Sequence, residues 1–266
     1  MVKTMAFQAI YLGSNPSRRI LINFINCIKF LKIMISIIIP TLNEEKHLKE
    51  LLKNIKDQNP MDYEIIVVDY NSKDGTRAIA RKNDCKLVEG GRPARARNNG
   101  AKKARGRLLI FIDADSLLSK NFFRDSLREI QERKLNAGSC RTYPISGNLI
   151  DKIFFRIFNL WIVTTQFFYP NASGSYIFCE RRLHNKINGF NEKLALSEDM
   201  DYVKRVGKCG KFGILKSVKA YTSVRRFEKE GRLNLGVKLL LSAVYRIIFG
   251  EINTGIFRYG FRHKKR

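Results

Sequence analysis

The chain has 266 residues and a formal net charge of +26, and its pI is near 10.1. This length is enough for one catalytic domain with a small appended region. So basic a chain is expected to meet a polyanion, which is nucleic acid, an anionic bilayer or a phosphorylated substrate. The five cysteines include no C-x-x-C pair, which excludes the usual zinc and dithiol redox motifs and fits a reducing cytoplasm.

Residues 1–33 differ in pattern from the rest of the chain and are predicted to be an N-terminal extension. Ile20–Ile33 is apolar but is interrupted by asparagine and lysine residues, so it is too short and too polar to span a bilayer. It also lacks the clean apolar stretch and the cleavage site of a signal peptide. Two interpretations stay open: the functional protein begins at Met34, or the segment is an amphipathic helix that rests on a membrane or on the domain.

From Ile35 onward, strand-like and helix-like segments alternate. Short β-branched or apolar runs predict buried strands, and turn signals or helical spacing between them predict helices. The predicted strands are Ile35–Ile39, Ile65–Val68, Lys86–Val88 and Leu108–Ile112, and the helices between them begin near Asn43, Asp74 and Arg92. This order predicts right-handed crossovers and a Rossmann-like, mostly parallel α/β sheet flanked by helices.

Beyond Asp115 the alternation stops and amphipathic helices are predicted. They cover Asn121–Arg133, Asp151–Phe168 and Leu235–Ile248. In the second helix the apolar side chains gather toward one face, made up of Ile153, Phe154, Ile157, Phe158, Trp161 and Phe168. This face is expected either to pack on the sheet or to contact a membrane, and the last two helices are too short and interrupted to be spans.

Asp113 and Asp115 follow the fourth strand two positions apart, so in extended backbone their side chains project to the same side. Two carboxylates there suit Mg²⁺ or Mn²⁺, which takes its other ligands from water and substrate phosphates. The alternative is that Asp115 only starts the next helix. Because polar segments after neighbouring parallel strands emerge at one sheet edge, we favour a metal-bound, nucleotide-like ligand.

Polar residues also follow the second and third strands. Asp69 is placed to accept hydrogen bonds from a base or ribose, although capping of the turn at Asn71 and Ser72 is the alternative. Gly90–Pro93 predicts a loop and a helix start that, with Arg97 nearby, offers positive potential to a diphosphate. The competing interpretation of this arginine-rich segment is a basic solvated face.

A run of acids in Ser197–Asp201 precedes a further predicted helix. Serine capping with acids in the first turn is favoured by the helix dipole alone. The functional interpretation makes Asp199 a general base over the reaction centre, while Glu198 orients a substrate or the local loop.

These motifs resemble those of family 2 glycosyltransferases with a GT-A fold. SIIIPTLNEE, IIVVDYNSKDGT, GGRPARARNNGAKKARGRLLIFIDAD and GFNEKLALSEDMD occur in the family's order between Ile35 and about Gly210. The resemblance implies that the nucleotide is held by Pro40, Thr41, Asn43, Glu44 and Asp69, with Arg97 near it. It also implies that Asp113 contacts ribose or diphosphate, that Asp115 ligates the metal and that Asp199 is the catalytic base.

The sequence departs from the family pattern at two places. Many members have a second acid where this chain has Tyr70, which puts recognition of the base by paired carboxylates in question. The Q-x-x-R-W motif of processive members is absent, and SVRRFEKEG lies downstream instead. Arg225 or Arg226 is therefore expected to approach the diphosphate or an anionic acceptor, and the chain resembles a single-addition enzyme more than a polysaccharide synthase.

The sequence thus predicts an inverting, metal-dependent glycosyltransferase that moves a sugar from a nucleoside-diphosphate sugar to a glycan or lipid-linked acceptor. Residues 34–225 form the predicted catalytic domain and residues 226–266 a basic amphipathic tail. The expected location is the cytoplasm, at the inner face of an anionic membrane. The alternatives are a sugar nucleotidyltransferase, which releases pyrophosphate, and a nucleic-acid-binding protein without catalysis, which the charge favours but no motif supports.

Overall fold

The computed structural model describes residues 33–60, 62–145, 148–194 and 197–232, together with residues 234, 236–238, 241, 242 and 245. Nearly all of the predicted N-terminal extension and much of the predicted C-terminal helix at Leu235–Ile248 lie outside these residues. The described part of the predicted tail begins within α10, which covers Arg225–Glu230.

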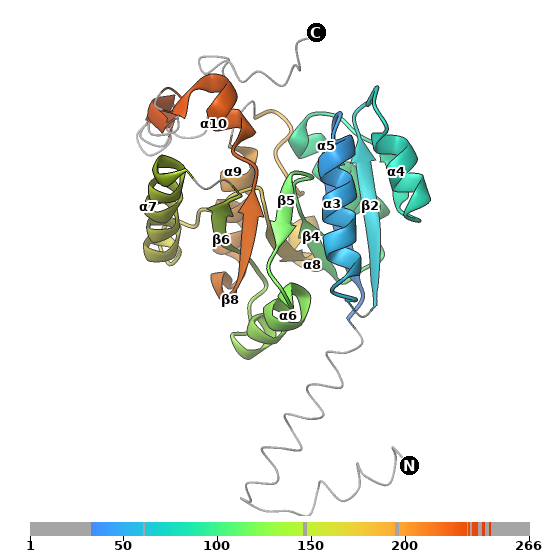
Figure 1. The fold of residues 1–266 in the computed structure, drawn as a ribbon. Helices are drawn as coiled ribbons and strands as arrows, with labels where there is room; N and C mark the ends of the chain where they lie inside the picture. The colour runs from blue at the N-terminus through green and yellow to red at the C-terminus, as the bar shows by residue number, and fades with distance from the viewer. Residues whose placement is uncertain are drawn as a thin grey trace, which may run out of the picture.

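An eight-stranded sheet runs through the molecule in the order β3-β2-β1-β4-β7-β6-β8-β5 (Figure 1). Its strands are β1 Ile35–Thr41, β2 Tyr63–Asp69, β3 Lys86–Glu89, β4 Leu108–Phe111, β5 Ser116–Leu118, β6 Ala137–Pro144, β7 Ile177–Glu180 and β8 Phe212–Thr222. The first four strands are parallel, as predicted, whereas β7 runs antiparallel to both of its neighbours. The predicted mostly parallel sheet is therefore present in the first half of the chain, and the second half adds mixed pairing.

Helices cover both faces of the sheet. They are α3 Glu45–Lys56, α4 Thr76–Lys82, α5 Pro93–Lys103, α6 Phe122–Glu132, α7 Leu149–Thr165, α8 Arg181–Lys186 and α9 Glu198–Cys209. The predicted helices near Asn43, Asp74, Arg92 and Asn121 are confirmed to within a few residues. No helix in the part of the chain that the structure describes is long and apolar enough to cross a bilayer.

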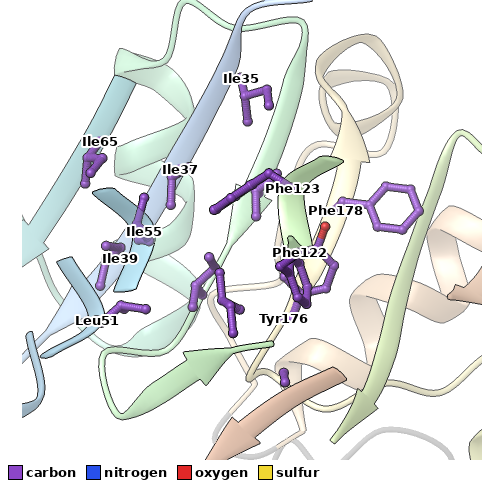
Figure 2. Close-up of a cluster of buried hydrophobic side chains, with 14 of the residues drawn as sticks. Ile35, Ile37, Ile39, Leu51, Ile55, Ile65, Phe122, Phe123, Tyr176 and Phe178 are labelled. Atoms are coloured by element: carbon purple, nitrogen blue, oxygen red, sulfur yellow. The ribbon is translucent and has the colours of Figure 1, made fainter. Parts of the chain in front are cut away.

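The β1 strand, which is buried at every position except Pro40, explains why two cores form. Ile37 and Ile39 belong to a cluster with Leu51 and Ile55 of α3, which Figure 2 shows together with Phe122 and Tyr176. Ile38 points to the opposite face, where α5, α8 and α9 pack. Since side chains alternate along a strand, an unbroken β-branched run is what a strand buried on both faces requires.

Of the two interpretations of the helix at α7, packing of the predicted apolar face on the sheet is wrong. The side that packs toward β6 carries Asp151, Phe155, Asn159 and Ile162, which are at most 7% exposed. Much of the apolar face that was expected to meet the sheet points outward instead: Ile153 and Ile157 are exposed. The reason is that both buried polar side chains have partners. Asn159 donates to Thr142 O and accepts from Thr142 N, and Asp151 pairs with Arg232.

Candidate active site

Parallel pairing brings the ends of β1, β2 and β4 to one edge of the sheet. Thr41 at the end of β1 lies in register with Asp69 at the end of β2, and Ile38 is in register with Phe111 at the end of β4. The backbone beyond β4 then carries Asp113 and Asp115 to this edge. The juxtaposition of the segments after β1, β2 and β4 is therefore a direct result of strand register, as expected for a ligand site in an open α/β sheet.

Asp69 is buried and its carboxylate is already engaged. It accepts hydrogen bonds from Thr41 Oγ1 at 3.2 Å and from Ser72 N at 3.1 Å, and Arg77 Nε lies 3.8 Å away. These are the turn-capping contacts of the alternative interpretation. Gly90 closes the same corner, because its N–H donates to Asp69 O at 2.8 Å and any Cβ there would collide with that carbonyl.

Asn43 and Glu44, just beyond Pro40 and Thr41, are held in place by hydrogen bonds to the segment after β2. Asn43 has a φ of 53°, in the left-handed region that asparagine tolerates better than most residues. Its N–H donates to Ser72 Oγ at 2.8 Å, and its Oδ1 accepts from Lys73 N at 2.7 Å. Asn43 thus joins the loops after β1 and β2, which shapes the predicted nucleotide pocket.

Arg97 is the centre of a buried charge cluster. Its side chain is 4% exposed; Nη1 donates to Glu198 Oε1 at 2.7 Å and Nη2 donates to Asp113 Oδ1 at 2.9 Å. Burial opposes the positive charge, but the carboxylates of Asp113 and Glu198 hold the pKa of Arg97 above its usual value. Arg97 therefore connects the end of β4 to the start of α9, and it is not part of a solvated basic face.

Asp199 lies beside this cluster at the start of α9. Burial, reinforced by the neighbouring Glu198 carboxylate, raises the pKa of Asp199 to about 7. Such a carboxyl can accept a proton near neutral pH, which is what a general base requires. The capping interpretation does not describe this turn, because Ser197 has a φ of 60° and its side chain makes no capping hydrogen bond.

Arg225, at the start of α10, joins the two remaining acids of the site. Its guanidinium forms a two-point ion pair with Glu44, and its Nε lies 3.5 Å from Asp115 Oδ2. Burial and the nearby Asp113 raise the pKa of Asp115 to about 7 even with Arg225 present. Carboxylates gathered in this way favour a cation between them.

The carboxylates at this edge fit a divalent cation only if water and substrate phosphates supply its other ligands. Among the described residues, no group of three or more histidine, cysteine, aspartate or glutamate side chains is placed to hold a metal. Mg²⁺ is commonly bound through one or two protein carboxylates, with water and substrate phosphates completing its shell. Asp115 fits that mode.

Three residues near the site were not predicted. Gly174 lies over the cluster: a Cβ there would stand 2.8 Å from Arg97 Nη2, 3.1 Å from Asp113 Oδ2 and 3.3 Å from Asp199 Oδ2. His47 Nδ1 lies 3.0 Å from Glu44 Oε2, and Phe190 faces the Arg97 guanidinium at 5.4 Å. Gly174 and Phe190 lie outside the parallel half, and His47 lies within α3, so the pattern of polar residues directly after strands gave no signal for them.

Arg226 takes a different direction from Arg225. Its Nε donates to Glu230 Oε1 at 3.0 Å within α10. Burial lowers the pKa of Arg226 from its ordinary value, while Glu230, Asp199 and Glu198 act in the opposite sense. The structure therefore places Arg225 against the acids after β1 and β4, and Arg226 within the electrostatic influence of the acids on α9.

The sheet has an acid-rich edge, and an aspartate on a helix lies opposite that edge. The fold belongs to the GT-A class of glycosyltransferase folds. The model of the family described as Glycosyl transferase family 2 matches residues 36–187, more than half of the chain. The chain belongs to this family.

Curated relatives match over part of their length. The poly(ribitol-phosphate) β-N-acetylglucosaminyltransferase TarS of Staphylococcus aureus is 29% identical over 131 residues, which are 46% of this chain and 23% of TarS. The GalNAc(5)-diNAcBac-PP-undecaprenol β-1,3-glucosyltransferase of Campylobacter jejuni is 34% identical over 95 residues, 32% of this chain and 30% of the relative. The matched segments thus span less than a third of either relative.

Solved structures share the fold. S. aureus TarS 1–349 in complex with UDP-GlcNAc aligns with a TM-score of 0.58 at 24% identity, covering 72% of this chain and 58% of that one. The mannosyltransferase PcManGT of Pyrobaculum calidifontis, in complex with GDP-Man and Mn²⁺, aligns with a TM-score of 0.63 at 21% identity, covering 84% and 68%. At these identities the likeness establishes the fold alone.

Proposed function

We propose that this chain transfers a sugar from a nucleoside-diphosphate sugar to an acceptor, with inversion at the anomeric carbon. The observation that carries the proposal is the position of Asp199, with a pKa raised to about 7, beside the Arg97–Asp113 pair and close to the backbone of Gly174. Similar structures hold UDP-GlcNAc or GDP-Man, which supports a nucleotide-sugar donor.

In the proposed reaction Asp199 accepts the proton of the acceptor hydroxyl while that oxygen forms a bond to the anomeric carbon. The bond between this carbon and the diphosphate oxygen breaks, and the electron pair leaves with the nucleoside diphosphate. Arg225 and Arg226 are placed to meet the charge that develops on it, whereas Arg97 fixes the carboxylates around Asp199. Mg²⁺ or Mn²⁺ at Asp115, when bound, would act as a Lewis acid toward the diphosphate.

Pro40, Thr41, Asn43, Glu44 and Asp69 are proposed to hold the nucleotide, and Asp113 the ribose or diphosphate. The Asp69 carboxylate has little spare capacity, because Thr41 and Ser72 already donate to it. Its contribution to base recognition is therefore expected to be indirect, through the shape of the loop that it caps.

The acceptor is proposed to be a glycan or a lipid-linked sugar. The name of the C. jejuni relative describes an undecaprenol-linked acceptor and that of TarS a polymer of ribitol phosphate, so both classes occur among similar proteins. We place the catalytic domain at residues 34–225 and a basic tail at residues 226–266, and we propose that the protein works in the cytoplasm at an anionic membrane. With an already anionic acceptor, Asp199 would orient more than it deprotonates.

The test is turnover of UDP-, GDP- and dTDP-sugars with Mg²⁺ or Mn²⁺ by the wild type and by the Asp199→Asn and Asp115→Ala variants. We expect metal-dependent turnover of one donor, lost in both variants, with release of the nucleoside diphosphate. Release of pyrophosphate from a nucleoside triphosphate and a sugar phosphate would instead identify a nucleotidyltransferase. Binding of nucleic acid with no donor turned over would favour the non-catalytic alternative.

A further inference from the structure

The outer side of α7 is an apolar surface with no partner among the described residues. Ile157 is 64% exposed and Leu160 66% exposed, and the two aromatic residues after the helix, Phe167 and Phe168, are 83% and 77% exposed. The α7 face is defined here as Leu149, Ile150, Ile153, Ile157, Leu160, Phe167 and Phe168. Contiguous apolar surface of this kind marks an interaction site more often than scattered single residues do.

The helix cannot turn this face inward without breaking polar contacts on its other side. Asn159 makes two hydrogen bonds to the main chain of Thr142, at 2.8 and 3.0 Å. Asp151, fully buried, accepts from Arg232 Nε at 3.0 Å. A rotation would leave these buried groups unpaired, so the outward direction of the α7 face is fixed by the fold.

The exposed charges of α7 itself have one sign, although Glu228 of the neighbouring α10 is also exposed. Lys152 and Arg156 are exposed beside it, and from Lys152 to Cys179 the sequence contains no aspartate or glutamate. The single acid of the helix, Asp151, is buried against Arg232. An apolar helix face bordered by exposed cations, in a chain of net charge +26, is suited to the interface of an anionic bilayer.

We propose that the α7 face docks on an anionic lipid bilayer, with its apolar side chains at the level of the headgroups and Lys152 and Arg156 against lipid phosphates. A second copy of the chain fits less well. In a two-fold symmetric contact the same surface meets itself, which would bring Lys152 and Arg156 of both copies together with no exposed acid on α7 to balance them.

The α7 face lies next to the candidate active site. Phe227 of α10 packs on Phe154 of α7 with ring centroids 5.1 Å apart, and Arg225 Nε of α10 lies 3.5 Å from Asp115 Oδ2. Figure 1 shows α10 next to one end of α7. A bilayer that contacts α7 would therefore lie beside α10, which contributes Arg225 to the candidate site. A lipid-linked acceptor at this site would then be close to the bilayer. This purpose rests on the proposed function, but bilayer binding itself is measurable without any donor or acceptor.

The test is sedimentation of the full chain with phosphatidylcholine vesicles that contain or lack phosphatidylglycerol. The wild type is expected to bind the anionic vesicles and to be released by salt. Replacing two exposed apolar residues, in Ile157→Ser with Leu160→Ser, is expected to weaken binding about tenfold or more. Reversing the flanking charges, in Lys152→Glu with Arg156→Glu, is expected to weaken it to a similar extent.

Two controls separate docking from general effects. Lys49 and Lys53 are exposed on α3 with the same four-residue spacing, so Lys49→Glu with Lys53→Glu makes the same change in net charge away from α7 and should retain most of the binding. Ile157→Leu with Leu160→Ile keeps the apolar surface and should bind like the wild type. Thermal melting verifies that each variant is folded.

Equal loss in the α3 and α7 charge variants would overturn the proposal, because binding would then follow net charge alone. Vesicle binding unchanged by the serine pair would also overturn it, and if that pair instead split a dimer seen by gel filtration, the α7 face would be a contact between copies. Failure of the proposed function is a separate outcome. If the protein bound vesicles through α7 but turned over no sugar nucleotide, the proposed transferase activity would be wrong and the docking proposal would stand.

Discussion

The two halves of the sheet build their share of the site in different ways. In the parallel half, polar residues follow consecutive strands and are braced locally, as Asp69 is by Thr41 and Ser72. In the mixed half, charges arrive from distant positions: Glu198 reaches Arg97 across 101 residues, and Arg225 reaches Glu44 across 181. The first half therefore provides loops that are fixed by local hydrogen bonds, whereas the second provides side chains held mainly by ion pairs.

The largest expected effect concerns the mixed half. Asp199→Asn removes the proposed base while preserving size and hydrogen bonding, so kcat should fall by about 10²- to 10⁴-fold, with donor affinity nearly unchanged. The measurement is steady-state transfer together with donor binding by calorimetry. Asp201→Asn is the control on the same helix: it loses the ion pair with Arg205 but should keep kcat close to that of the wild type. If both variants lost activity equally, the effect would belong to the helix and not to the base.

The second prediction concerns Arg97, which connects the two halves of the sheet through Asp113 and Glu198. Arg97→Met leaves the carboxylates of Asp113 and Glu198 without their buried cation, and the free energy of unfolding should fall by about 3 kcal/mol or more. Chemical denaturation measures this. Arg105→Met is a comparison within the parallel half: its partner is Glu64, but the arginine side chain is 71% exposed, so the loss should stay within about 1 kcal/mol. Similar losses would mean that burial does not distinguish the two ion pairs.

The close packing around Gly174 gives a smaller, more local effect. Gly174→Ala forces the side chains of Arg97 or Asp113 to move, and a displacement of this kind next to the reacting groups should lower kcat/KM by tens of fold with a minor change in melting temperature. The matched control is Gly236→Ala, where nothing lies within 4 Å of the added Cβ. Unchanged kcat/KM in the Gly174 variant would remove this glycine from the site.

The pH dependence should be the mildest effect. With its pKa raised to about 7, free Asp199 is protonated below neutral pH, so kcat/KM should rise as pH increases through about 7. The same shift affects stability with the opposite sign. Folded Asp199 retains a proton that the unfolded chain has released, so the free energy of unfolding falls as pH rises from about 4 to about 7. The stability of Asp199→Asn relative to the wild type should therefore be greater at pH 8 than at pH 3, as measured by denaturation at both values.

The same contrast explains what the sequence could predict. The strands of the parallel half and the residues after them follow from local patterns, because register alone brings Thr41 next to Asp69. The family and the fold were also recognisable from the motifs. The orientation of α7 was not, because hydrophobic periodicity assumes that polar residues face water, whereas Asn159 and Asp151 are buried against partners elsewhere in the chain. The long-range pairs of Arg97 and Arg225 depend on the same tertiary packing.

The position of Arg225 has a consequence for how the protein admits a ligand. Before any donor arrives, Glu44 and Asp115 already share a cation, so binding is an exchange of partners and not the filling of an unbalanced site. A donor that binds these carboxylates would compete with Arg225, while Arg232 pairs with Asp151 of α7 beyond the end of the helix. The short helix α10 is therefore tied at its start to the acids of the donor site and beyond its end to α7, so one segment connects the two.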